Sequence, residues 1–438
     1  MSRFVYSLLF YLGTPLVWLR LLWRARKQPE YLQHLDERYA FYRRDIRQGL
    51  PLIWLHAVSV GETRAAEPLI EALLREYPQH RILLTHMTPT GRATGQEFLM
   101  KHPDRLLQAY LPYDLPDACG RFFRHFRPSL GLLMETELWP NLIAQAQGHG
   151  TPVALINARL SARSARGYQR FPRLIHPAFA ALSAVAAQTL ADAERLTALG
   201  ARHVAVCGNL KFDVTPAAER LALGKTWKAA FGARPVLLAA STREGEETLL
   251  LAALAACPLP DLLLILVPRH PQRFAEVATL VREHGFSVCR RSENTLPDAA
   301  TQVWLGDTMG EMAAYYAAAD LAIIGGSLLP FGGQNLIESA ACGCPVLVGP
   351  HTFNFTQAAA DAVACGAAQR VGNVELAMSA AHDLLQDRTA LQAMQQAAKD
   401  FSREHRGASE RTLALISRIL PTHSEKVALL GAQLQTSL

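Results

Sequence analysis

The segment from Ala319 to Pro350 constrains the fold more than any other part of this chain. It begins with a short apolar run, Leu321–Ile324, which is typical of a strand covered on both faces. A turn with two Gly-Gly pairs follows, and the stretch Asn335–Cys342 then predicts a helix that ends before a glycine and a proline. Another apolar run completes the segment. This succession of strand, helix and strand indicates a parallel sheet with helices packed against it.

The same alternation of apolar and helical segments runs along most of the sequence. We predict strands at Leu52–Val58, Ile82–His86, Leu130–Met134, Val153–Ile156, Val204–Cys207, Val236–Ala240, Leu262–Val267, Val303–Leu305, Leu321–Ile324 and Val346–Val348. The polar interval Asp213–Pro235 is typical of a linker between two such groups of strands. We therefore expect two doubly wound, Rossmann-like α/β domains, with the loops after their strands facing each other across a cleft.

Composition narrows the classes of function. The 438 residues are 50% hydrophobic, which is enough for two globular domains, and the formal net charge is +6. The cationic residues are mostly arginine and form no lysine-rich block, so we expect an anionic small-molecule or lipid partner and no nucleic acid. Seven cysteines without a CxxC pair argue against a disulfide framework or a zinc site. No DxD pair occurs either, which removes one common way of holding a metal-bridged ligand, and we expect no cofactor.

The N-terminus predicts a membrane anchor. Phe4–Leu19 is uncharged and apolar, and Arg20, Arg24, Arg26 and Lys27 follow it. As a helix this run spans about 24 Å, less than the ~30 Å hydrocarbon core of a bilayer. Because the positive charges follow the apolar run, the pattern is not that of a secretory signal peptide, and the positive-inside rule keeps the bulk of the chain in the cytoplasm. The alternative is an ordinary buried first helix.

Carboxylates follow two strands of the first predicted domain. Glu62 lies in the first turn of a predicted helix, where the helix dipole would favour the ionised form that a general base requires. The alternative is a harmless helix cap. Glu135 and Glu137 follow Leu130–Met134, and two carboxylates at one strand end are costly unless they bind something. The competing explanation is a structural network with arginines.

Five arginines, Arg159, Arg163, Arg166, Arg170 and Arg173, recur at spacings of four, three, four and three. This spacing predicts one cationic face of a single helix ending near Pro172. We expect the face to contact acidic lipid headgroups or a phosphorylated lipid substrate, and a plain solvated face is the alternative.

In the second predicted domain, three loops are candidates for binding a nucleotide. The glycine-rich turn and the helix expected from Asn335 would hold a phosphate at Gly333–Leu336, and Glu338 would accept hydrogen bonds from a ribose. Arg269 and His270 follow the strand Leu262–Val267, and the neighbouring loop Asp307–Met312 would hold the base or sugar through its backbone. A purely structural connection between strand and helix is the alternative for the glycine-rich turn.

Taken together, these segments resemble the 3-deoxy-D-manno-octulosonic acid (Kdo) transferases of lipid A biosynthesis over the whole chain. The matching motifs occur in one order along both domains: HAVSVGE at His56–Glu62, METELWPN at Met134–Asn141, NARLS at Asn157–Ser161, LKFD at Leu210–Asp213, VPRHPQR at Val267–Arg273 and GGSLLPFGGQNLIE at Gly325–Glu338.

The resemblance implies a GT-B glycosyltransferase on the cytoplasmic face of the inner membrane. It implies an inverting transfer of Kdo from CMP-Kdo to the tetra-acylated, bis-phosphorylated lipid A precursor, lipid IVA, with no metal required. Glu62 corresponds to the general base, and Glu135 and Lys211 correspond to residues that stabilise the transition state. The CMP-binding positions carried over are Arg269, His270, Gly310, Glu311, Met312, Asn335, Leu336, Ile337 and Glu338. We assign Glu137, Arg159, Arg163 and Arg166 to the acceptor.

The expected organisation is an anchor at residues 1–27, an acceptor-binding domain at 28–215, a donor-binding domain at 216–405 and a helical segment at 406–438. In one arrangement, Arg411–Ile419 crosses back onto the first domain. Other functions compatible with the residues are a GT-B enzyme that uses a UDP-sugar, a sugar-nucleotide epimerase, and a non-catalytic, membrane-anchored lipid-binding protein.

Overall fold

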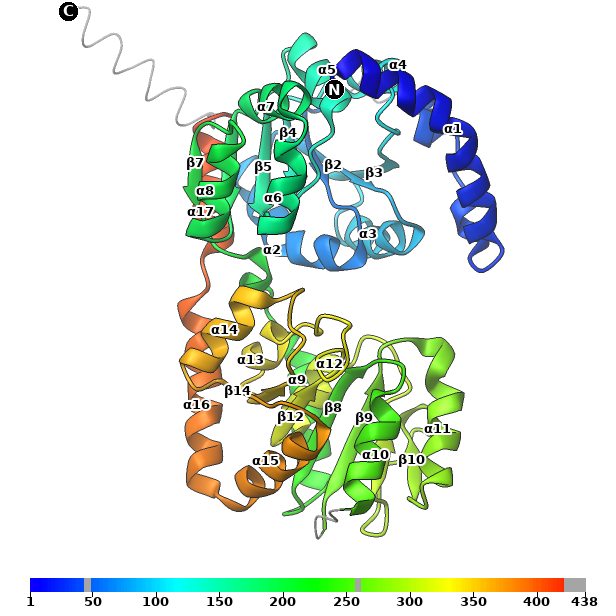
Figure 1. Cartoon of the computed structure of the whole chain (residues 1–438), viewed down its shortest axis with the longest axis vertical. Helices are drawn as coiled ribbons and strands as arrows, with labels where there is room; N and C mark the ends of the chain where they lie inside the picture. The colour runs from blue at the N-terminus through cyan, green and yellow to red at the C-terminus, as the bar shows by residue number, and fades with distance from the viewer. Residues whose placement is uncertain (43–48, 257–260, 421–438) are drawn as a thin grey trace, which may run out of the picture. The chain divides into compact units, whose positions relative to one another are not determined.

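The computed structural model describes residues 1–42, 49–256 and 261–420, which form two compact units (Figure 1). The first unit comprises Met1–Val214 and the segment from Gly407 onward, and the second comprises Thr215–Arg406. Parts of the predicted domains, and residues 421–438 of the predicted helical segment, lie outside the described residues. Each unit is built around its own seven-stranded parallel sheet.

The strand order of the first sheet is β3-β2-β1-β4-β5-β6-β7, with every neighbouring pair parallel. The strands are β1 Leu52–His56, β2 Arg81–His86, β3 Leu106–Tyr110, β4 Leu130–Met134, β5 Val153–Ala158, β6 Ala184–Ala187 and β7 Val204–Val206. The direction in which strands are added reverses between β1 and β4. In doubly wound sheets, ligands bind beyond the carboxyl ends of the strands at this switch point.

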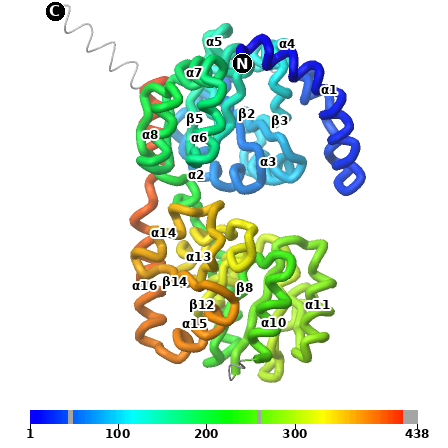
Figure 2. Tube along the Cα trace, viewed as in Figure 1, coloured from blue at the N-terminus to red at the C-terminus, as the bar shows by residue number. Residues whose placement is uncertain are grey.

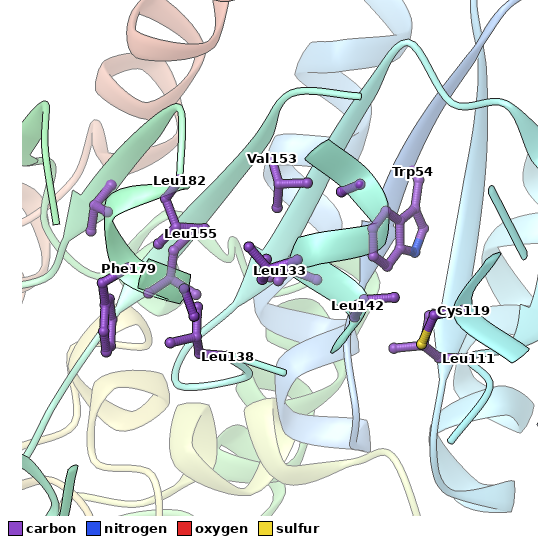
Figure 3. Packing of buried hydrophobic residues seen from close by; sticks show 14 of the residues in the cluster. Trp54, Leu111, Cys119, Leu133, Leu138, Leu142, Val153, Leu155, Phe179 and Leu182 are labelled. Atoms are coloured by element: carbon purple, nitrogen blue, oxygen red, sulfur yellow. The ribbon is translucent and has the colours of Figure 1, made fainter. Parts of the chain in front are cut away.

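Helices cover both faces of the first sheet (Figure 1). The helices and 3-10 turns of this unit are α1 Arg3–Ala25, η1 Pro29–Leu32, η2 Glu37–Tyr39, α2 Val60–Glu76, α3 Pro89–Lys101, α4 Pro116–Phe126, α5 Pro140–Gly148, α6 Ala162–Gln169, α7 Pro172–Ala180, α8 Leu190–Ala198, η3 Leu210–Asp213 and α17 Ala408–Ser417. Because side chains alternate along a strand, Leu52 and Trp54 face α4, α5, α7 and α8, whereas Ile53 and Leu55 face α2, α3 and α17. Figure 3 shows the first of these cores around Trp54.

The N-terminal helix α1 is longer than its uncharged run predicts. It has 23 residues, which span about 34 Å. It is long and apolar enough to cross a membrane, and almost all of its apolar stretch lies outside the core of the protein. One side of α1 lies on the first unit, since Ser7 donates to Asn141 Oδ1 at 3.0 Å and the ring of Trp18 stacks on Tyr39. The opposite side leaves apolar residues such as Leu12 exposed.

The second sheet has the strand order β10-β11-β9-β8-β12-β13-β14, again entirely parallel, with its switch point between β8 and β12. Its strands are β8 Val236–Thr242, β9 Leu263–Pro268, β10 Val288–Arg290, β11 Val303–Leu305, β12 Leu321–Ile324, β13 Val346–Val348 and β14 Ala368–Arg370. Its helices and turns are α9 Ala218–Ala230, α10 Glu246–Ala256, η4 Pro271–Arg273, α11 Phe274–Glu283, η5 Arg291–Glu293, α12 Met312–Ala318, α13 Ile337–Ala341, α14 Thr356–Ala364, α15 Val374–Gln386 and α16 Arg388–Glu404.

Apolar helices cover the second sheet as well. Leu250 and Leu251 of α10 pack with residues of α11 and α15 on one face. On the other face, Trp304 of β11 packs edge-on against Trp227 of α9 at 4.9 Å between ring centroids. The C-terminal part of the described chain then belongs to the first unit, as the path of the tube in Figure 2 shows.

The predicted strands are found, with ends shifted by up to two residues, but two features of the prediction are wrong. The interval Asp213–Pro235 is no extended linker, because it contains helix α9, whose Trp227 is buried. The strands β3, β6, β10 and β14 were not predicted. Leu106–Tyr110 carries a central glutamine and Ala184–Ala187 is mostly alanine, so neither has the β-branched composition of a typical buried strand.

The close packing of β1, β4 and β5 generates a stability prediction. A Cβ atom on Gly131 would lie 2.7 Å from Trp54 Cε3 and 3.2 Å from Val153 Cγ2, and these neighbours are packed in the core of Figure 3. We expect Gly131→Ala to destabilise the protein by about 1–3 kcal/mol, because an overpacked core must shift. Thermal unfolding of the full chain measures the effect.

Gly148→Ala is the matched control. Gly148 ends α5 with nothing within 4 Å of the added Cβ, so alanine should leave stability unchanged or raise it by up to about 1 kcal/mol. Equal unfolding temperatures for the two variants would contradict the packing described for this core.

Candidate functional site

The switch point of the first sheet brings together acidic side chains from two loops. Glu62 is the third residue of α2, directly after β1, and Glu135 is the first residue after β4. Because β1 and β4 are adjacent and parallel, the two loops lie side by side at the carboxyl end of the sheet.

Glu62 is held by neutral donors. Its carboxylate accepts a hydrogen bond from the Val58 backbone N–H at 2.9 Å and another from Ser59 Oγ at 3.1 Å. Burial, followed by the negative charge of Glu135, raises the pKa of Glu62 to about 7. The prediction that the helix terminus would favour the charged form is therefore wrong. Desolvation outweighs the dipole at this position.

Glu135 has the opposite environment. It is 8% exposed, its Oε2 accepts from Arg159 Nε at 3.0 Å, and its Oε1 accepts from Lys211 Nζ at 3.3 Å. Burial alone would raise its pKa, but the charges of Lys211 and Arg159 hold the pKa below the usual value. Its backbone is left-handed, with φ of 57°, which is uncommon for a residue other than glycine. Both the structural network with an arginine and the clustering of carboxylates expected from the sequence are present.

Glu137 contacts an aromatic residue of the same loop. Trp139 Nε1 donates to Glu137 Oε2 at 2.7 Å, and the Trp139 ring lies edge-on to His56 at the end of β1. Burial, with a smaller contribution from the charge of Glu135, raises the pKa of Glu137. The loop therefore carries one carboxyl group with a lowered pKa and one with a raised pKa.

The predicted single arginine helix is wrong. Arg159 lies before α6, Arg163 and Arg166 are exposed on α6, and Arg170 is the residue that ends this helix. A new helix, α7, starts at Pro172, which has no backbone N–H and disfavours a helical residue before it. The five guanidinium groups therefore share no helix face, and Arg159 belongs to the Glu135 cluster.

In the second unit, the predicted phosphate loop has a different structure. Its helix, α13, begins at Ile337 rather than Asn335, because Asn335 Oδ1 accepts from the Ile337 N–H and forms a turn instead. The N–H groups of Gly333 and Gln334 donate to the carbonyl groups of Gly326 and Gly325, at 2.7 and 2.9 Å. These amides are already engaged, so Gly333–Leu336 is not the helix terminus that the sequence suggested.

A buried carboxylate that was not predicted fixes this glycine-rich loop. Glu246 is 0% exposed and accepts from the backbone N–H groups of Arg243, Gly326, Leu328 and Leu329 at 2.6–3.3 Å. Burial raises its pKa despite these four donors. The signal in the sequence was the acidic run Glu244, Glu246 and Glu247 directly after β8, because charged residues at a switch point commonly bind a ligand or a backbone group.

The other predicted donor residues lie at neighbouring strand ends. Arg269 and His270 directly follow β9, with the Arg269 side chain exposed. Burial, then the charge of Arg243, lowers the pKa of His270, which favours its neutral form. Glu311 is buried and paired with Arg220 and Arg291, so it offers little beyond its backbone.

The remaining predicted donor positions also leave mainly backbone groups. Gly310 has φ of 77° and open space around it, and Met312 starts α12. The side chains of Leu336 and Ile337 are buried, while Glu338 on α13 is half-buried. In the part of the chain that the structure describes, no group of three or more His, Cys, Asp or Glu side chains is arranged to hold a metal ion.

Comparison with known proteins identifies the family. Residues 33–214 match the family model described as 3-deoxy-D-manno-octulosonic-acid transferase (kdotransferase). The 3-deoxy-D-manno-octulosonic acid transferase of Bordetella pertussis is 46% identical over 427 residues, which cover 94% of this chain and 98% of that protein. The enzyme of the same name from Haemophilus influenzae is 38% identical over 429 residues, covering 96% of this chain and 99% of its own length.

A solved glycosyltransferase from Rickettsia africae has a similar fold. It superimposes with a TM-score of 0.59 at 13% identity and covers 85% of this chain and 99% of its own. Together with the two parallel α/β units, this similarity shows a GT-B fold. The chain belongs to the family of Kdo transferases and is a glycosyltransferase.

Proposed function

We propose that this protein transfers Kdo from CMP-Kdo to the tetra-acylated, bis-phosphorylated lipid A precursor, with inversion at the anomeric carbon. In this reaction an acceptor hydroxyl oxygen attacks the anomeric carbon while the bond from that carbon to the CMP phosphate oxygen breaks. Glu62 takes the hydroxyl proton, and CMP leaves with the bonding electron pair. The family membership supports the donor sugar, and the pair Glu62 and Glu135 supports the chemistry.

The observation that carries this proposal is that two neighbouring carboxyl groups, Glu62 and Glu135, have pKa values shifted in opposite directions. A general base works best with a pKa near the operating pH, which the value of about 7 for Glu62 satisfies. Glu135, held anionic by Lys211 and Arg159, supplies a fixed negative charge that would favour an oxocarbenium-like centre. Neighbouring acidic groups whose pKa values are pushed apart commonly divide catalytic roles in this way.

On the donor side, we propose that CMP is bound by groups at the strand ends of the second unit. Arg269 and a neutral His270 would contact the single phosphate, and backbone groups of Gly310–Met312 and Asn335–Glu338 would contact the nucleoside. One phosphate carries little charge, so an arginine and oriented N–H groups suffice to neutralise it.

On the acceptor side, Glu137 is proposed to bind a sugar hydroxyl, and the exposed Arg163 and Arg166 to bind a phosphate of the lipid. The apolar helix α1 would hold the enzyme on the cytoplasmic face of the inner membrane. Its length of about 34 Å and exposed apolar side support this location.

The first test is Glu62→Gln, which keeps the shape of the side chain and removes the base. We expect kcat to fall by about 10²–10⁴-fold with thermal stability retained. Product masses from CMP-Kdo and the tetra-acylated precursor measure the transfer. Glu76→Gln, at the exposed C-terminal end of the same helix, is the control and should leave kcat unchanged. Full activity of Glu62→Gln would refute the assignment of the base.

The second test is the pH dependence of the wild-type enzyme. Because Glu62 acts only when ionised, kcat/KM should rise with pH and reach half its maximum near the pKa of about 7. This acidic limb should be absent from the residual activity of Glu62→Gln. If kcat/KM instead reached half its maximum near pH 4.5, the ordinary pKa of a glutamate, then Glu62 is not desolvated or another group is the base.

The third test addresses the acceptor. We expect the double substitution Arg163→Ser with Arg166→Ser to raise the KM for the lipid acceptor by about 10-fold, and to leave the KM for CMP-Kdo within about two-fold. Arg202→Ser, an exposed arginine on a loop before β7, is the charge-matched control. An unchanged acceptor KM would remove these arginines from the site.

A further inference from the structure

The chain leaves the first unit once and later returns to it. The carboxylate of Asp213 binds the point of departure to the point of return, and both points lie within the first unit. The first unit ends at Val214 and resumes at Gly407. Asp213 Oδ1 accepts from the Gly407 N–H at 2.7 Å, and Asp213 Oδ2 accepts from the Ser409 N–H at 2.5 Å. Asp213 is thereby joined to two residues that lie 194 and 196 positions further along the chain.

These two bonds cap helix α17 from another part of the chain. The N-cap residue of α17 is Gly407, which has no side chain and a left-handed backbone with φ of 90°. The first N–H groups of a helix need an acceptor, and a carboxylate there also interacts favourably with the helix dipole. Asp213 supplies what a local Ser, Thr or Asp would supply in an ordinary helix.

Asp213 is also the last residue of η3, the short turn that carries Lys211. The start of this turn is fixed by amide side chains, since Asn157 Oδ1 accepts from the Leu210 N–H and Asn209 Oδ1 accepts from the Lys211 N–H, both at 3.0 Å. Asp213 fixes its other end. The position of the Lys211 Nζ atom, 3.3 Å from Glu135 Oε1, therefore depends on both anchors.

Helix α17 lies against the same elements. Ala408, Leu415 and Ile416 belong to the apolar cluster that contains Leu210 of η3 and the buried face of α2. Helix α2 begins with the turn that carries Glu62. The returning segment of the chain is thus packed behind both Glu62 and Lys211.

We propose that Asp213 is a positioning residue for transfer, which acts by holding Lys211 against Glu135 through the cap of α17. This inference rests on the roles proposed above for Glu135 and Lys211. It assigns Asp213 no contact with substrate. Asp213 instead joins two segments of the first unit. One is η3, which comes just before the chain leaves this unit, and the other is the start of α17, which comes just after the chain returns to it.

The test uses Asp213→Asn, which retains one acceptor oxygen, and Asp213→Ala, which retains none, in the full-length enzyme. We expect kcat to fall by about 10-fold in the first variant and further in the second, with both substrate KM values within about two-fold of wild type. If the alanine variant does not fold, the asparagine variant alone decides the outcome.

Asp387→Asn is the matched control. Asp387 caps α16 in the second unit through a single oxygen, Oδ1, which accepts from the Thr389 and Ala390 N–H groups at 3.0 Å each. Because asparagine keeps this oxygen and is as good a cap as aspartate, the control should change thermal stability little and leave kcat unchanged. An Asp213→Asn variant that behaves like this control would show an ordinary helix cap and overturn the proposal.

Combination with Lys211→Met separates the remaining outcomes. If Asp213 acts through Lys211, then Asp213→Asn should cause no further loss of kcat in the Lys211→Met background. A full additional loss there would overturn the proposed route. Wild-type activity of Lys211→Met alone would refute the role of Lys211 in the proposed function and this inference with it, whereas an inactive Lys211→Met beside an active Asp213→Asn refutes the inference alone.

Discussion

The ion pairs of Glu135 with Lys211 and Arg159 are the interaction on which the site of the first unit depends. A buried carboxylate without partners would cost several kcal/mol, and the left-handed backbone at Glu135 adds about 1–3 kcal/mol of strain. The two cations offset these costs and keep the carboxylate ionised. The resulting fixed charge in turn acts on Glu62, where it adds to the effect of burial. The cluster thus keeps Glu135 ionised and adds to the effect of burial on the pKa of Glu62.

The raised pKa of Glu62 has a cost in stability that favours a chemical role. A change from 4.5 to about 7 corresponds to roughly 3 kcal/mol. Because the folded-state pKa lies above the unfolded value, this destabilisation is complete above pH 7 and disappears below pH 4.5. Retention of a destabilised carboxyl group at a switch point is typical of a site where activity opposes stability.

The sequence predicts those features that depend on local pattern. Leu130–Met134 and Leu321–Ile324 have the predicted ends, because short apolar runs between turns specify buried parallel strands. The arginine spacing misled because periodicity alone ignores Pro172, which starts a new helix. The pKa of Glu62 and the hydrogen-bond partners of Glu246 were beyond prediction, since each depends on groups that only the folded chain brings near. Sequence motifs located the strand-end loops, and packing decided which groups in them are ionised or engaged.

The contrast between Glu135 and the other buried carboxyl groups shows which feature distinguishes the site. Glu246 accepts four backbone N–H groups, and burial still raises its pKa. Glu137 accepts a bond from Trp139, and its pKa is raised as well. Neutral hydrogen-bond donors therefore do not overcome the rise in pKa that burial causes in Glu246 and Glu137. At Glu135 the full positive charges of Lys211 and Arg159 reverse this rise and lower the pKa. Without them burial would raise the pKa of Glu135 as it raises that of Glu62, and the switch point would lose its fixed negative charge.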